Sequence, residues 1–406
     1  MSGLMPAHRA GSVAASLLRL PANRLRHPLA LASRRYRTQA QAHPQPKAGT
    51  IRQAPPTRGA ATAAAASPAA AIPHPSQASM PEPVPVSPRK PQLNLPAQAY
   101  KPDFYNAIST IMQLRDRYIE DRVLFVPGRE MARLLRQLGA RDEDFSSLQA
   151  VSDNLVGDPT LPYRKTRNGR FCLDFDAGTL HRLEFQPFIL SKAEDFSRYD
   201  SDKVRHFDEV ENDLQLNTVF QALMVFKSAI YHGVRSLRRP NMDYETNKWI
   251  CTLFSVRTTT TPERLGEPAL EGVHTDGVDH TMTTFLGCRN MRSESAVTYV
   301  HDMKEITGVR YTEASPDHIK GCVHHRHFLD TMIVVDSERK HSLSPVYAVD
   351  PNRPATRDML VFFSRKPTVA GHVSADMDSL TPHLNLPMEI PVFVPFWPRG
   401  PGGTRV

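Results

Sequence analysis

The tripeptide His274-Thr275-Asp276 constrains this 406-residue chain more than any other feature. Residues two apart in an extended segment point to the same side, so the His274 imidazole and the Asp276 carboxylate project together. With one more imidazole, this pair forms a two-histidine, one-carboxylate triad, which holds one face of an Fe(II) ion and leaves the other face open. His341, within residues 338–345, is the candidate for the second imidazole.

Arg357 is the candidate for a fourth residue of the site. It follows His341 along the chain and opens an apolar strand, Asp358 to Phe363. An oxygenase that uses 2-oxoglutarate needs a buried cation for the distal carboxylate, and a guanidinium fork makes two hydrogen bonds to a carboxylate. The tripeptide alone is a weak signal in a chain with 17 histidines, so the iron site depends on all four residues together. Arg365 or Lys366, at the far end of the same strand, is the alternative anion anchor.

These residues belong to a longer pattern that resembles one branch of the Fe(II)/2-oxoglutarate dioxygenases. This branch includes bacterial hydroxylases of free L-amino acids such as L-isoleucine. The similarity covers roughly residues 180–366, with its motifs concentrated in residues 249–366. They are Glu271 to Asp279, Arg289-Asn290, Glu294-Ser295, Leu329 to Asp336, His341 to Pro345 and Thr356 to Val361.

The resemblance implies a set of ligands and a reaction. The iron ligands are His274, Asp276 and His341, and Arg357 holds 2-oxoglutarate. The co-substrates are 2-oxoglutarate and O2, the products include succinate and CO2, and ascorbate is expected to help turnover. Related halogenases lack the carboxylate ligand, so Asp276 favours hydroxylation of a substrate C–H bond.

The sequence departs from the family pattern at three places, and these departures leave the identity of the substrate undecided. Thr275 stands between the ligands, Arg292-Ser293 precedes Glu294, and Ser337 follows Asp336. These positions lie near the expected substrate entrance, so Glu294 and Thr275 are the candidates for substrate contacts. The substrate could be a free amino acid, a small peptide-derived metabolite or a protein side chain.

Charge separates the beginning of the chain from the rest. Residues 1–95 carry twelve Lys and Arg and one acidic residue, a net charge of +11, so the whole-chain value of +8 leaves 8 − 11 = −3 for the remainder. The basic character therefore belongs to the N-terminal segment, and the mildly acidic remainder does not favour nucleic-acid binding.

The N-terminal segment itself has two parts. Residues 1–40 contain Arg, Ser, Ala and Leu but no Asp or Glu, which is typical of a mitochondrial transit peptide that the import machinery would bind. A basic tail on a cytoplasmic protein is the alternative. Residues 41–96 are rich in Ala, Pro, Ser and Gln, which predicts a disordered linker. We find no apolar run long enough to span a membrane.

Residues 97–398 are expected to form one dioxygenase domain of the α+β class, followed by a flexible tail over 399–406. A helical lead-in over 97–156 precedes a double-stranded β-helix, or jelly-roll, core mainly over 160–366, flanked by helices. Apolar spacing predicts helices over 103–118, between Pro127 and Gly139, and over 143–151 and 212–231. Strands are expected over 169–175, 183–189, 249–256, 280–286, 296–300, 331–335, 343–349 and 359–363.

Two alternatives remain open at this point. Cys322, His324, His325 and His327 could form a second metal cluster, although a polar loop is the plainer interpretation. The four cysteines of the chain form no CxxC pair, which indicates free thiols in a reducing compartment. The competing function is a catalytically silent relative of the barrel that acts as a binding or scaffold protein.

Overall fold

The computed structural model describes residues 92–190 and 201–392. The expected transit peptide, most of the expected linker and the tail over 399–406 lie outside these residues. Residues 92–96 were expected at the end of the linker, yet Leu93 and Leu95 are buried in the main hydrophobic core. The Leu93 N–H also donates to Gln221 Oε1 at 2.7 Å. This short segment therefore belongs to the folded part.

The helices confirm the four predicted helical segments, with one break. Asn217 interrupts the segment predicted over 212–231, because its side chain accepts hydrogen bonds from the N–H groups of Val219 and Phe220 and so begins a new helix. The helices are α1 Pro102–Asp121, α2 Gly128–Gln137, α3 Glu143–Ala150, α4 Asn212–Gln215 and α5 Thr218–Tyr231, with short 3₁₀ helices η1 Val151–Asn154, η3 Pro316–His318 and η4 Ala375–Met377.

Within residues 92–190 and 201–392, the strands form two sheets whose strand pairs are antiparallel. The larger sheet has the order β1-β9-β6-β11-β5-β3-β4-β12 with β2 beside β3, and the smaller has the order β10-β7-β8. The bounds are β1 Val123–Val126, β2 Val156–Gly157, β3 Arg164–Asp174, β4 Thr179–Leu183, β5 Lys248–Thr260, β6 His280–Arg289, β7 Thr298–His301, β8 Ile319–Val323, β9 Thr331–Val335, β10 Lys340–Leu343, β11 Ala355–Arg365 and β12 Glu389–Pro391.

Two predicted strands are wrong beyond their first residue. The strand expected over 183–189 is β4, which ends at Leu183, and beyond it Phe188 makes only an isolated bridge with Arg205. The strand expected over 343–349 is β10, which ends at Leu343. Beyond β10, Val346 and Ala348 likewise make only isolated bridges, with Gly266 and Met291. The apolar spacing in both segments thus continues where the chain forms single bridges and no ladder.

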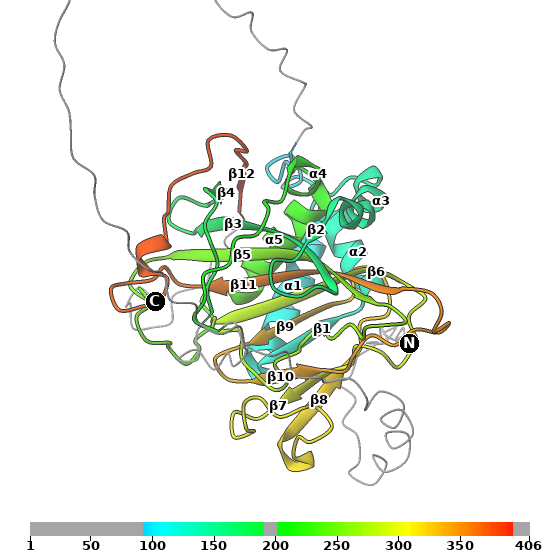
Figure 1. The fold of residues 1–406 in the computed structure, drawn as a ribbon. Coiled ribbons are helices and arrows are strands. Elements are labelled where there is room, and N and C mark those ends of the chain that lie inside the picture. The colour runs from blue at the N-terminus through cyan, green and yellow to red at the C-terminus, as the bar shows by residue number, and fades with distance from the viewer. Residues whose placement is uncertain (1–91, 191–200, 393–406) are drawn as a thin grey trace, which may run out of the picture. The chain divides into compact units, whose positions relative to one another are not determined.

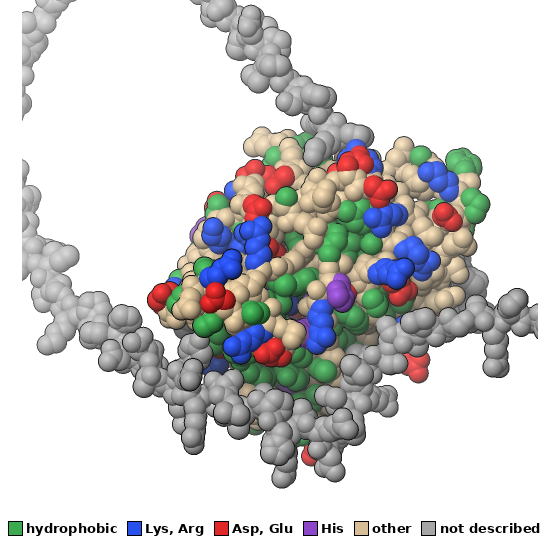
Figure 2. Space-filling view, turned by 90° about the vertical axis from the view of Figure 1, so that its right-hand side faces the viewer, with side chains coloured by type: hydrophobic (Ala, Val, Ile, Leu, Met, Phe, Trp, Pro, Cys, Tyr) green, Lys and Arg blue, Asp and Glu red, His purple; other side chains and the backbone are tan. Residues whose placement is uncertain are grey.

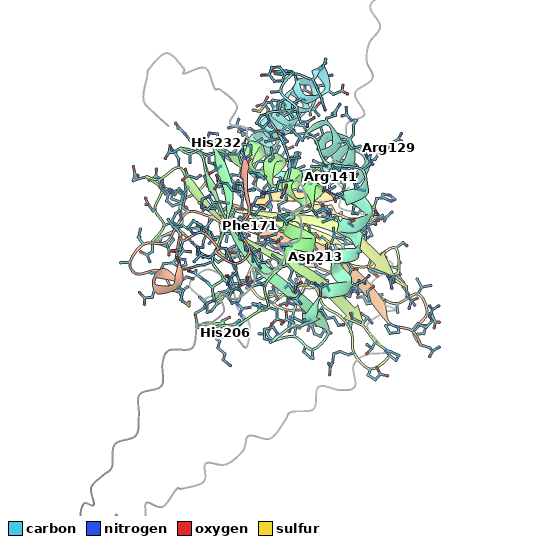
Figure 3. The ribbon with its side chains drawn as sticks, turned by 90° about the horizontal axis from the view of Figure 1, so that it is seen from above. Arg129, Arg141, Phe171, His206, Asp213 and His232 are labelled. Atoms are coloured by element: carbon cyan, nitrogen blue, oxygen red, sulfur yellow. The ribbon has the colours of Figure 1, made fainter. Side chains whose placement is uncertain are left out.

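The large sheet has a helix-covered face and a cavity face. Figure 1 shows α1 and α5 behind the central strands, with β7, β8 and β10 below. Figure 3 places Phe171 of β3 in the middle of the helix-covered layer, where its ring centroid lies 5.5 Å from that of Phe220 on α5. Because side chains alternate along a strand, Cys251 and Leu253 of β5 join this core, whereas Phe254 lines the cavity. No helix in the described ranges has the length and apolar character needed to cross a membrane.

Candidate active site

His274 and His341 are brought together by backbone pairing. His274 lies in the connection between β5 and β6, and His341 lies in β10. The His274 N–H donates to the His341 carbonyl at 3.0 Å, and the His341 N–H donates to the His274 carbonyl at 2.9 Å. Residues paired in this way are direct neighbours on the two segments, which explains how the two imidazoles come to lie in one space.

The predicted triad converges. Within residues 92–190 and 201–392, His274, Asp276 and His341 are the one group of three or more His, Cys, Asp or Glu side chains with ligand atoms all within 4.8 Å of one another. His274 Nε2 lies 3.5 Å from Asp276 Oδ1, and His341 Nε2 lies 3.4 Å from Asp276 Oδ2. All three residues are buried. The spacing that singled out the first two residues therefore places them in a pocket suited to a metal ion.

The three groups shift one another's pKa values. Burial acts to raise the Asp276 pKa. The neighbouring His341 and His274 outweigh burial and lower this pKa to about 2. Burial lowers the His341 pKa to about 4, although Asp276 opposes this change. Burial acts to lower the His274 pKa, but Glu271 and Asp276 together raise it to about 9. The site thus keeps its carboxylate ionised and concentrates negative charge around the His274 imidazole.

Three residues hold the carboxylate and its loop in place. Thr281 Oγ1 donates to Asp276 Oδ2 at 2.7 Å. The Asp276 N–H donates to both carboxylate oxygens of Asp336 at 2.9 Å. Arg239 Nη2 in turn lies 2.9 Å from Asp336 Oδ2. Outer contacts of this kind orient metal ligands in proteins.

The triad opens into a cavity of about 140 Å³ that lies between the two sheets. Arg357 of β11 lies in its wall and is 4% exposed. Its buried Nε has no hydrogen-bond partner among the described residues. Burial lowers the Arg357 pKa to about 10, so the guanidinium stays charged at neutral pH. An uncompensated buried cation favours an anionic ligand.

The alternative anchor is engaged elsewhere. Arg365 Nη1 lies 2.9 Å from Asp378 Oδ2, and Arg365 Nη2 donates to Asp378 Oδ1 at 3.0 Å. Lys366 Nζ donates to the Thr246 carbonyl at 2.6 Å. Neither residue lines the triad cavity, whereas Arg357 does.

The two residues expected to contact substrate, Glu294 and Thr275, do not line the cavity. Glu294 is exposed in the connection after β6 and lies 3.9 Å from Arg292. Thr275 is fully buried but absent from the cavity wall, because the alternation that brings His274 and Asp276 together turns the residue between them away.

The histidine-rich segment before β9 forms no metal cluster with Cys322 within the described ranges. Instead, His325 Nε2 lies 3.1 Å from Thr283 Oγ1, and His324 Nδ1 accepts a hydrogen bond from Arg326 Nε at 2.9 Å. All four cysteines lie in the described part of the chain and are free.

Sequence reasoning missed three charged residues of the cavity wall: Glu271, Arg164 and Arg205. Glu271 Oε1 lies 3.3 Å from His274 Nε2, and its position three residues before His274 was the available signal. Arg164 lies 2.6 Å from Asp158, and the Arg205 guanidinium lies over the Phe188 ring. The two arginines come from distant segments, and nothing in their local sequence indicates the cavity.

The residues present suit both a divalent iron and a dicarboxylate. Two imidazoles and one carboxylate with an open side form the donor set that non-haem Fe(II) oxygenases use. Arg357 offers the buried cation for a carboxylate of a co-substrate bound in the same cavity.

Comparisons with known proteins agree with this geometry. The chain is 48% identical over 302 residues to the bifunctional enzyme flvA of Aspergillus flavus, a match that covers 74% of this chain. The match covers 37% of flvA, so the chain spans little more than a third of that relative.

Two solved structures are also similar. The Fe(II)/α-ketoglutarate-dependent dioxygenase TqaL is 53% identical with a TM-score of 0.64, and the match covers 72% of this chain and 99% of TqaL. A bsmA homologue from Methylobium petroleophilum has a TM-score of 0.51 at 20% identity, over 64% of this chain and 95% of the homologue, which shows a shared fold. A sequence profile of the 2OG-Fe dioxygenase family matches residues 149–363, more than half of the chain. The chain therefore belongs to the 2OG-Fe dioxygenase family, whose enzymes depend on Fe(II) and 2-oxoglutarate.

Proposed function

We propose that this chain hydroxylates an unactivated C–H bond of a free L-amino acid or a related small carboxylate, using Fe(II), 2-oxoglutarate and O2. The observation that carries the proposal is the convergence of His274, Asp276, His341 and Arg357 on one cavity. In the proposed assignment the first three bind the iron and Arg357 binds the distal carboxylate of 2-oxoglutarate.

The protein residues have separate tasks in this proposal. When bound, the iron couples oxidative decarboxylation of 2-oxoglutarate, which yields succinate and CO2, to hydroxylation of the substrate. Asp276 and the two histidines would hold the iron and would present it to the cavity. Thr281 and Asp336 keep the carboxylate ligand oriented. The apolar residues of the wall, among them Phe254 and Met359, exclude water from the reacting groups.

The size and the charges of the cavity favour a small zwitterionic substrate. Its volume of about 140 Å³ is below the range of about 300–1,000 Å³ typical of drug-sized ligands. Glu271 can pair with a substrate ammonium, and Arg205 can pair with a substrate carboxylate while Arg357 holds 2-oxoglutarate. An aliphatic side chain then fits against the apolar wall. These three charges favour an amino acid over an uncharged metabolite.

We also assign the two sheets to a double-stranded β-helix. The cavity lies between β5, β6 and β11 of the larger sheet and β7 and β10 of the smaller one, which supports the assignment. Nucleic acid is disfavoured as a partner, because the residues after position 95 carry a net charge of −3. On the face drawn in Figure 2, Lys and Arg are interspersed with Asp and Glu. A nucleic-acid site would instead require a basic patch or stripe.

The test is succinate formation by the purified chain with Fe(II), ascorbate, 2-oxoglutarate and each of the twenty L-amino acids in turn. We expect one or a few amino acids to stimulate turnover and to gain one oxygen atom, detected by mass spectrometry. In Glu271→Gln, the KM for that amino acid should rise roughly tenfold, the loss of one charge-assisted hydrogen bond. Turnover without stimulation by any amino acid would contradict the substrate class, and absence of all turnover would favour the catalytically silent barrel.

A further inference from the structure

The core contains a lysine in direct contact with a cysteine thiol. Lys227 of α5 is 1% exposed, and Cys251 of β5 is completely buried. Lys227 Nζ lies 2.7 Å from Cys251 Sγ and 2.7 Å from Ser364 Oγ. The pair lies on the helix-covered face of the large sheet, opposite the cavity, and neither residue takes part in the proposed chemistry of the iron site.

The nitrogen–sulfur distance is unusual. A separation of 2.7 Å is normal between a nitrogen donor and an oxygen acceptor, but sulfur is a larger atom, so this contact is closer than a hydrogen bond to sulfur requires. It is also longer than a direct nitrogen–sulfur bond. The distance fits two atoms that flank a single bridging atom.

The surroundings favour a reactive amine. Lys227 has no carboxylate within ion-pair distance among the described residues, and its Nζ lies 5.5 Å from the centroid of the Tyr231 ring and 5.4 Å from that of Phe362. Burial lowers the Lys227 pKa, although Cys251 opposes the change. A desolvated lysine becomes a nucleophile when it loses its proton.

From this contact we propose that Lys227 and Cys251 form a covalent N–O–S bridge when the protein is exposed to O2. The amine and the thiol together bring three hydrogens. The O–O bond breaks, one oxygen inserts between nitrogen and sulfur, and the other leaves as water with two hydrogens, while the third stays on nitrogen. Nitrogen and sulfur each lose two electrons, and O2 gains four.

The oxidant is available, because O2 is a co-substrate of this enzyme family and is small and apolar enough to enter the core. The bridge would join α5 to β5 across 24 positions of the chain. Since alternate residues of β5 line the cavity, the link would fasten one wall of the active site to the helical layer. A cross-link that closes a loop of this size raises the melting temperature of the oxidised protein, by roughly 5 °C.

The test compares complete protein purified in air with protein purified anaerobically in dithiothreitol. Both are denatured and digested without reductant and analysed by mass spectrometry. We expect the air-exposed sample to contain one peptide pair that joins Lys227 to Cys251, with the mass of both peptides plus one oxygen and minus two hydrogens. Dithiothreitol should cleave the S–O bond and release the Cys251 thiol.

The variants separate this bridge from other oxidation. Lys227→Met and Cys251→Ala should both lose the joined peptide and the difference in melting temperature between air and reductant. Cys172→Ala, which removes another buried thiol from neighbouring β3, should retain both. The proposal is overturned if Cys251 in wild-type protein stays a free thiol after exposure to air and hydrogen peroxide. It is equally overturned by a direct N–S link or by a disulfide at Cys251. Mass analysis of the wild-type chain decides these outcomes even if a variant fails to fold.

Discussion

Both carboxylate oxygens of Asp336 accept a hydrogen bond from the backbone N–H of Asp276, each at 2.9 Å. Asp336 Oδ2 also accepts from the Val278 N–H at 3.2 Å. One buried side chain directly after β9 thus fixes the loop that presents the His274 and Asp276 ligand atoms. Burial and the nearby Asp276 raise the Asp336 pKa to about 7, whereas Arg239 acts to lower it. We therefore regard Asp336 as a positioning residue.

Replacing Asp336 should weaken iron binding without unfolding the protein. Loss of an outer contact to a metal site costs 10–100-fold in metal affinity, and we expect about that loss of Fe(II) affinity in Asp336→Ala. Asp336→Asn, which keeps one acceptor oxygen, should lose less. Anaerobic Fe(II) titration measures the effect, and the exposed Asp317→Asn serves as the control. Equal affinity in all four proteins would contradict the assigned role.

Replacing Arg357 should affect 2-oxoglutarate binding, whereas replacing Arg365 should affect stability. In Arg357→Gln the distal carboxylate of 2-oxoglutarate loses its charged partner, so the KM for 2-oxoglutarate should rise roughly 100-fold, equivalent to about 2.7 kcal/mol. Arg365→Gln breaks the ion pair with Asp378 and should lower the melting temperature while leaving that KM unchanged. The steady-state KM and a thermal scan of each variant check the pair. A reversed result would restore Arg365 as the anchor.

Asp378 should make stability depend on pH in acid. Its carboxylate is 2% exposed and lies 2.7 Å from Arg170 and 2.9 Å from Arg365. Burial acts to raise the Asp378 pKa, but Arg365, Arg170 and the Thr368 N–H hold it well below its usual range. A depressed carboxyl pKa contributes stability above the unfolded pKa of about 3.9, and this stability is lost as pH falls below that value.

Asp378→Asn should therefore cost about 3 kcal/mol of unfolding free energy at pH 7, because it leaves the buried Arg170 and the half-buried Arg365 without their partner. The difference from wild type should shrink as the pH falls below about 4. Urea denaturation of both proteins across this pH range measures it. A difference that stayed constant with pH would exclude the ion pairs as its cause.

Leu95 tests where the folded part begins. Its side chain is 5% exposed in the main core, although the local composition predicted a disordered linker there. Leu95→Ala should destabilise the protein by about 2–4 kcal/mol, whereas the same change at Leu384, which is 86% exposed, should stay within about 0.5 kcal/mol. Chemical denaturation gives both values. If the two changes had equally small effects, the docking of this segment would be refuted.

The sequence could predict those parts of the site that depend on local geometry. His274 and Asp276 share a face because of their spacing, and Arg357 lies near the start of β11, where the alternation of side chains aims it at the cavity. Glu271 offered a local signal, because it stands three residues before His274, whereas Arg205 offered none. The presence of Arg205 in the cavity depends on its isolated bridge with Phe188, which no local pattern records.

The elements of the fold likewise divide into those that local sequence predicts and those that depend on distant segments. Long amphipathic segments such as α1 were predicted within a few residues. The short strand β1, Val123–Val126, was missed, because a four-residue apolar run between two helices gives no periodic signal. It becomes a strand by pairing with β9, which lies about two hundred residues further along the chain. The errors at 183–189 and 343–349 arise because apolar residues continue past Leu183 and Leu343, where the two ladders end.

The central claim is that His274, Asp276 and His341 bind the iron, and anaerobic Fe(II) titration of the purified chain tests it most directly. The proposed site predicts one Fe(II) per chain for the wild type and an affinity loss of at least about 100-fold in Asp276→Ala and His341→Ala, since each removes a ligand. His318→Ala, a change at a partly exposed histidine outside the cavity wall, should bind like the wild type. Undiminished Fe(II) binding by both ligand variants, with their folds intact by circular dichroism, would contradict the account.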